Sequence, residues 1–157
     1  ALLSEPKLIS GYLIGDLNPH AVELLTQNLE YLSARRKGIE KLPPLELSPT
    51  EIHCRDALEW AMDSENHSSC DLLLVNLPHH SIAHIEALMP LLKRGQTSVL
   101  RGWAIIERSE LENREQTILE AISKASGMVE EFTFKEVKGF STTKVFMCFE
   151  AWLNLSA

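Results

Sequence analysis

Three polar side chains that can bind a ligand each follow an apolar stretch of the sequence. They are Asp16, Asp56 and Asn76. A carboxylate accepts hydrogen bonds from both hydroxyls of a ribose, and a side-chain amide both donates and accepts. In open α/β sheets ligands bind beyond the carboxyl ends of the strands, so the spacing predicts that the three line one rim of a sheet. Asp also caps helices and Asn also caps turns, so a purely structural role stays open for each.

Residues 71–78 are the stretch around which the other elements are expected to assemble. Four consecutive apolar residues, Leu-Leu-Leu-Val, do not alternate with polar ones. This pattern predicts a strand that is buried on both faces at the centre of a parallel sheet. Pro78 cannot continue strand pairing, so the strand should end at Asn76.

The first half of the chain reads as strand, helix, strand and short helix. An apolar strand is predicted at residues 8–15, and a second strand at residues 51–54. Between them Asn18 suits an N-cap and Pro19 the first helical position, and Gly38 can end this helix. Residues 39–50 hold three prolines and read as a surface connection.

The second half of the chain adds helices on either side of a strand and then a hairpin. Ser81 can cap a helix that Pro90 should kink or shorten. Ser109 and Glu112 have the spacing of a capping box, which predicts the start of another helix. The strands expected in this half are 97–106, 129–137 and 144–153, the last two joined as a hairpin.

These elements predict one fold class for the whole chain. Strands alternating with helices, followed by a hairpin, indicate a three-layer α/β sheet that is mostly parallel with a C-terminal antiparallel hairpin. The 157 residues fit a single domain. Its formal charge of −7, from 22 acidic and 15 basic residues, argues against nonspecific nucleic-acid binding by the whole surface.

The cysteines and the lack of targeting signals predict a cytoplasmic protein without a membrane span. The three cysteines lack a C-x-x-C spacing and are expected to be reduced thiols. No apolar run is long enough to cross a membrane, and the N-terminus lacks the regions of a signal peptide. His80 and His84 are four residues apart, but no third ligand is evident, so no metal site is predicted.

Taken together, these features resemble the class I S-adenosylmethionine-dependent methyltransferases in order and spacing. The similar features are the segment Asp16-Leu-Asn-Pro-His-Ala-Val-Glu-Leu-Leu25, the segment Asp56-Ala-Leu58, the turn Asn76-Leu-Pro78 and the terminal hairpin. Within that class the sequence is most similar to the archaeal and eukaryotic tRNA (guanine-N1)-methyltransferases and to the wybutosine-pathway transferases. The resemblance implies a Rossmann-like fold, S-adenosylmethionine as cofactor and tRNA as substrate.

The resemblance also implies roles for individual residues. The implied cofactor-binding residues are Asp16, Leu17, Asp56, Ala57, Asn76, Leu77 and Pro78. Asp16 would bind the cofactor ribose, and Asp56 with Ala57 would contact the adenine. Asn76 would lie beside the transferred methyl group and the target base, as a catalytic positioning group rather than a nucleophile.

The sequence departs from the family at its N-terminal end. The first strand and Gly-rich loop of the family should precede Asp16 by one helix, but only residues 1–6 stand there. We therefore expect a partial methyltransferase domain, with an unfilled slot beside the central strand.

The predicted function is S-adenosylmethionine-dependent methylation of a tRNA guanosine near the anticodon. The alternatives are a wybutosine-pathway aminocarboxypropyl transferase and a noncatalytic Rossmann-like interaction module. Trp103 could stack on a base, and Arg101 could bind a phosphate. Core packing explains Trp103 equally well.

Overall fold

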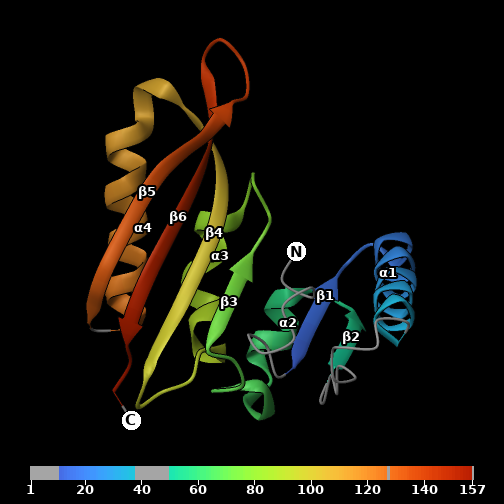
Figure 1. The fold of residues 1–157 in the computed structure, drawn as a ribbon. Coiled ribbons are helices and arrows are strands. Elements are labelled where there is room, and N and C mark those ends of the chain that lie inside the picture. The colour runs from blue at the N-terminus through green and yellow to red at the C-terminus, as the bar shows by residue number, and fades with distance from the viewer. Residues whose placement is uncertain (1–10, 38–49, 127, 157) are drawn as a thin grey trace. The chain divides into compact units, whose positions relative to one another are not determined.

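A computed structural model describes residues 11–37, 50–126 and 128–156, and these form two compact units. Unit 1 ends at Trp60 and unit 2 begins at Ala61. The elements of both are labelled in Figure 1. The predicted connection at residues 39–50 and the predicted helix end at Gly38 lie outside the described residues, apart from Thr50.

Unit 1 is built on two parallel strands. Strand β1 (Tyr12–Asp16) pairs in parallel with β2 (Thr50–Cys54), and Asp16 lies opposite Cys54 in the register. Helix α1 (Pro19–Lys37) connects them and contacts both, as the sequence predicts. Helix α2 (Ala57–Met62) follows β2, and its Trp60 packs against Gly15, where the lack of a side chain leaves room for the indole.

Unit 2 contains a four-stranded sheet and two α-helices. The strands are β3 (Leu72–Val75), β4 (Thr97–Glu107), β5 (Val129–Gly139) and β6 (Lys144–Asn154). The helices are α3 (Ser81–Leu88) and α4 (Leu111–Ser126), which pack against each other and lie on one face of the sheet (Figure 1). Short 3₁₀ turns occur at Ser64–Asn66, Met89–Leu91 and Arg108–Glu110.

The strand order in this sheet is β3-β4-β6-β5. Strands β3 and β4 are parallel, whereas β6 is antiparallel to both β4 and β5. The predicted hairpin is therefore confirmed, and its second strand lies inside the sheet with its first strand at the edge. Both units combine strands and helices, so the chain is a mixed α/β protein, as the sequence predicts.

The core of unit 2 lies between the sheet and the two helices. Every second residue of β4 from Ser98 to Ile106 is buried, and β6 supplies Phe149 and Leu153 to the same layer. Gly102 lies directly under the Phe149 ring, because a Cβ there would come within 2.8 Å of three ring carbons. Helix α4 contributes Ile118 and Ile122, which are fully buried.

The expectation that the strand at the centre of the sequence is buried on both faces is wrong within unit 2. Strand β3 is at the edge of the four-stranded sheet, and Leu72 and Leu74 are 36% and 43% exposed. Only Val75 of this strand is buried, on the side of the helices. The run of leucines has the composition of a strand whose two faces are both covered. Among the described residues of unit 2, β3 pairs with one strand only, which is β4.

The end of α3 near Pro90 agrees with the sequence prediction, whereas the start of α4 near Ser109 does not. Helix α3 ends at Leu88 and passes into a 3₁₀ turn containing Pro90, as predicted. Ser109 lies inside the 3₁₀ turn Arg108–Glu110, and α4 begins two residues later. The predicted capping box is therefore wrong, because the chain leaves β4 as a 3₁₀ turn and Ser109 is not at an N-cap position.

Candidate functional site

In unit 1 the two aspartates lie at the same edge of the β1–β2 pair. Asp16 ends β1, and Asp56 stands two residues beyond Cys54, the end of β2. The thiol of Cys54 donates a hydrogen bond to the carbonyl of Leu17 over 3.8 Å, so the segments that follow the two strands are in contact. The structure thus brings Asp16 and Asp56 together at the carboxyl edge, where the sequence places them.

Both aspartates are oriented by backbone N–H groups. Asp16 Oδ1 accepts a hydrogen bond from the Asn18 N–H at 2.8 Å, and Asp56 Oδ1 accepts one from the Leu58 N–H at 2.8 Å. Each carboxylate therefore has a structural task at the start of a helix and is held in one orientation. Asp16 and Leu17 are exposed, and Leu17 is exposed by 70%. Both carboxylates can accept further hydrogen bonds, because an ionised carboxylate has about four acceptor positions.

In unit 2 the turn after β3 places Asn76 on the surface. Asn76 and Leu77 are exposed, and Pro78 is partly buried. The carbonyl of Pro78 accepts a hydrogen bond from the Ile105 N–H at 2.9 Å, which attaches the turn to β4. The Asn76 amide consequently stands at the carboxyl edge of β3 on a backbone that is fixed at both ends.

Ser81 is the residue that fixes this turn, and the sequence analysis assigned it a different role. Its hydroxyl accepts the Leu77 N–H at 3.1 Å and lies 2.9 Å from the Leu77 carbonyl and 3.3 Å from that of Val75. The predicted N-cap role is wrong, since His80 occupies the N-cap position and Ser81 begins the helix. The sequence signal for this role is a serine four residues after Leu77. The burial of that serine could not be predicted from the sequence.

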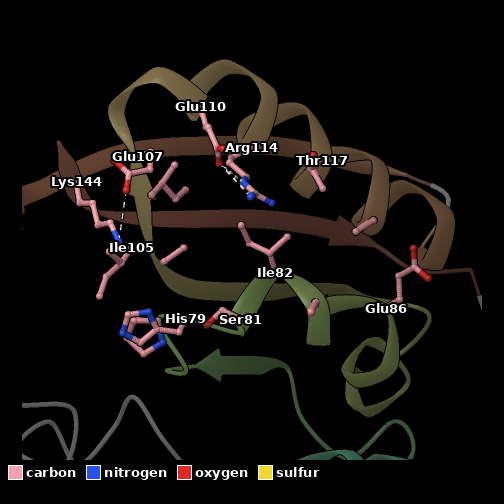
Figure 2. A pocket seen from close by; sticks show the side chains of 15 residues that line it. His79, Ser81, Ile82, Glu86, Ile105, Glu107, Glu110, Arg114, Thr117 and Lys144 are labelled. Carbon is pink, nitrogen blue, oxygen red and sulfur yellow. Dashed lines mark hydrogen bonds and ion pairs between the residues drawn. The ribbon is translucent and has the colours of Figure 1, made fainter.

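A cavity of about 620 Å³ lies in unit 2 between α3, α4 and β4. Figure 2 shows Ser81 and Ile82 on one side of it and the ion pairs on the other. The Lys144 ammonium lies 3.4 Å from a Glu107 carboxylate oxygen, and Arg114 lies 3.0 Å from Glu110. The cavity can hold an apolar or amphipathic group, since its charged lining residues of opposite sign are largely paired with each other.

The opposite face of the sheet has a smaller hollow of about 240 Å³. Arg101 and Trp103 line this hollow. Both residues lie in the middle of β4 and not at a strand end. Arg101 forms an ion pair with Glu150, which is 9% exposed. The guanidinium is thereby engaged within the sheet, which favours a structural role over the binding of phosphate.

The histidines that follow β3 do not assemble with other potential ligands. The His80 and His84 rings are stacked, with centroids 6.3 Å apart. Among residues 11–37, 50–126 and 128–156, no three His, Cys, Asp or Glu side chains gather closely enough to hold a metal ion. None of the helices in these ranges is long and apolar enough to cross a membrane.

Comparison of sequences yields no relative of this chain. No protein-family model matches the sequence. No curated protein matches it either.

Comparison of structures gives clear similarities at low sequence identity. TYW2 from M. jannaschii, in complex with AdoMet, has a TM-score of 0.67 and 14% identity, over 90% of this chain and 56% of TYW2. Trm5b from Pyrococcus abyssi has a TM-score of 0.63 and 15% identity, over 90% and 37% of the two chains. The tRNA m1G37 methyltransferase from M. jannaschii has a TM-score of 0.58 and 17% identity, over 90% and 36%.

These similarities define the fold. The chain has the fold of TYW2, Trm5b and the tRNA m1G37 methyltransferase, as the sequence resemblance predicts. It spans little more than half the length of TYW2 and just over a third of the two methyltransferases.

Proposed function

We propose that this chain is part of the catalytic domain of an S-adenosylmethionine-dependent methyltransferase that acts on a tRNA guanosine near the anticodon. The observation that carries the proposal is the agreement between fold and site. The fold matches that of TYW2 in complex with AdoMet over 90% of the chain, and the candidate polar groups stand at the carboxyl ends of parallel strands. Open α/β sheets bind ligands beyond the carboxyl ends of their strands.

The residues at this edge fit the cofactor in chemistry. The Asp16 carboxylate, held by the Asn18 N–H, is suited to accept hydrogen bonds from the ribose hydroxyls. Asp56 and Ala57 at the start of α2 are assigned to the adenine, and the exposed Leu17 adds apolar contact. The bound cofactor would supply an already activated methyl group, so these residues act by binding and orientation.

Asn76, Leu77 and Pro78 of unit 2 are assigned to the transferred methyl group and the target base. The turn is held by Ser81 and by the bond from Ile105 to Pro78, so the Asn76 amide needs little reorganisation to orient a planar base. Such preorganisation stabilises the transition state more than the ground state. Removal of the guanine N1 proton needs a general base that we do not assign to this chain.

The proposal is tested by measuring AdoMet binding to the intact protein by calorimetry. Asp16→Ala should weaken binding by about 1.5–3 kcal/mol, the usual value for a charge-assisted hydrogen bond. Thermal denaturation of the same variant checks that the fold is retained. An Asp16→Ala protein that folds and binds AdoMet with the affinity of the unmodified protein would contradict the assignment.

A second candidate is transfer of the aminocarboxypropyl group of the cofactor. It is favoured by the match to TYW2, which has a higher TM-score and a larger covered share than the match to the m1G37 methyltransferase. Two AdoMet samples, one radiolabelled in the methyl group and one in the carboxyl group, separate the candidates. Label in the tRNA from the first sample alone supports methyl transfer, and label from the second alone supports aminocarboxypropyl transfer.

The proposal includes the organisation and location of the protein. The 157 residues are taken as one partial methyltransferase domain, because the structural matches extend over about 90% of them. A cytoplasmic location is consistent with the three cysteines, all of which are free thiols. tRNA would reach the domain as a substrate, with contacts from parts of the protein beyond this chain.

A further inference from the structure

The hairpin between β5 and β6 extends well past the end of β3. Val75, the last residue of β3, lies opposite Gly102, and β4 continues five residues further to Glu107. At a rise of about 3.3 Å per residue, β4 reaches roughly 16 Å beyond β3. Glu107 pairs with Lys144 at the start of β6, and the hairpin turn projects further still (Figure 1).

The extended end of β4 and the hairpin lie at the same edge of the four-stranded sheet as the Asn76 turn. The parallel strands β3 and β4 both end there, and the hydrogen bond from Ile105 to Pro78 marks where the extension leaves the turn. A ligand held at the carboxyl end of β3 therefore has the extended end of β4 beside it, and the β5–β6 hairpin is the next part of the sheet beyond β4.

The hairpin turn is rigid and presents an aromatic ring to solvent. The Phe140 and Ser141 N–H groups donate to the Lys144 carbonyl at 2.9 and 3.0 Å. The Arg108 guanidinium forms two hydrogen bonds with Glu136, which tie the hairpin to the end of β4. Phe140 is nevertheless 55% exposed, so an ordered backbone holds a large apolar side chain in water.

The same hairpin is locally basic in an acidic chain. Residues 135–144 contain three lysines and one glutamate, a net charge of +2, whereas the whole chain carries −7. Lys144 is paired with Glu107. Lys135 and Lys138 are exposed and have no ion-pair partner within the described part of the chain. The Lys138 ammonium lies 6.0 Å from the centre of the Phe146 ring.

We propose that the β5–β6 hairpin binds single-stranded RNA beside the candidate site, with an unpaired base stacked on Phe140 and phosphates bound by Lys135 and Lys138. This inference rests on the proposed function, since it assigns the RNA contact of that site. Unpaired bases stack on exposed aromatic rings, and cations along the same path bind the backbone. A protein partner fits less well, because protein interfaces are depleted in lysine.

The test measures the affinity of the intact protein for a short unstructured RNA that carries 2-aminopurine. Phe140→Leu keeps an apolar side chain without a ring and should weaken binding about fivefold to a hundredfold, the range for one stacked base. It should also remove the fluorescence quenching of the 2-aminopurine. Phe140→Tyr, which keeps the ring, should bind as the unmodified protein does.

A matched pair of lysine variants tests the electrostatic part. Lys138→Gln should weaken binding and reduce the slope of log K against log salt by about 0.7, the value for one phosphate of a single strand. Lys124→Gln removes the same charge from an exposed lysine of α4 and should leave both quantities unchanged. Equal effects of the two substitutions would overturn the proposal.

Other outcomes separate this proposal from the proposed function. If Phe140→Leu binds RNA like the unmodified protein, or if the unmodified protein binds no RNA, the hairpin proposal is overturned. A change in oligomeric state on sedimentation, with unchanged RNA binding, identifies the hairpin as a protein contact instead and also overturns it. RNA binding that depends on Phe140 in a protein that binds no AdoMet would support the hairpin proposal and contradict the proposed function.

Discussion

At the level of single residues, the two aspartates of unit 1 combine structural and proposed binding tasks. Asp16 Oδ1 accepts the Asn18 N–H, and Asp56 Oδ1 accepts the Leu58 N–H. The alternatives of helix cap and ligand acceptor are therefore not exclusive, because a carboxylate has acceptor positions to spare. Substituting either residue affects a helix start as well as a site, so binding measurements on such variants need a stability measurement beside them.

Cys70 illustrates how burial suppresses a reactive group. Its thiol lies 3.4 Å from the Leu91 carbonyl, and burial, together with the neighbouring Asp71 carboxylate, raises its pKa from 9.0 to about 11. A shift of this size lowers the thiolate fraction at neutral pH roughly a hundredfold. The raised pKa also favours the protonated thiol in the folded state. Its contribution to the free energy of unfolding is complete below about pH 9 and is lost as the pH rises towards about 11.

We expect Cys70 to react far more slowly with iodoacetamide at neutral pH than the exposed Cys54. Mass spectrometry of tryptic peptides over a time course measures both rates in the same sample. The denatured protein is the control, because unfolding should make the two rates similar. Alkylation of Cys70 as fast as that of Cys54 in the folded protein would show that the thiol is not shielded.

At the level of elements, a buried side-chain hydroxyl helps to hold the turn between β3 and α3. Ser81→Ala leaves the Leu77 N–H without its acceptor and should lower the free energy of unfolding by about 1–3 kcal/mol. Hydrogen exchange of the Leu77 amide should become faster, and denaturant unfolding gives the stability change. Ser109→Ala is the control, since Ser109 is exposed. If Leu77 exchanges at its original rate in Ser81→Ala, another group holds the turn.

The elements that the sequence predicts correctly are those with strong local signals. Asn18 with Pro19 defines the start of α1, and Pro90 ends α3 early. These residues favour one local backbone geometry by themselves, so the signal survives in the folded protein. The same holds for the carboxyl-edge placement of Asp16 and Asp56, which follows from two parallel strands.

The errors occur where tertiary neighbours decide the outcome. The leucines of β3 predict burial on both faces, but the position of a strand in its sheet depends on which other strands pair with it. Ser109 has the capping-box spacing, yet the path of the chain out of β4 makes it part of a 3₁₀ turn. The role of Ser81 depends on contacts with Val75 and Leu77 that exist only once the turn has formed.

For the chain as a whole, its charge limits how it can bind RNA. A net charge of −7 repels phosphates, so RNA binding by this chain depends on local groups of cations such as those of the hairpin. We expect the 157 residues by themselves to bind tRNA no more tightly than about 10⁻⁶–10⁻⁴ M, the range of nonspecific contacts, and more weakly at higher salt. Fluorescence anisotropy at several salt concentrations measures this. Tight binding that resists salt would show that the acidic surface does not limit RNA binding.

The central claim is that Asn76 positions a tRNA guanine for transfer from S-adenosylmethionine. Its most direct test is the single-turnover rate of methyl transfer by the intact protein and by Asn76→Ala. We predict a rate about ten- to a thousandfold lower in the variant, as expected when one aligned polar contact of about 1.4–4 kcal/mol is lost, with a much smaller change in AdoMet affinity. An unchanged rate of transfer together with a lower melting temperature would show that Asn76 is a structural turn residue and would contradict the claim.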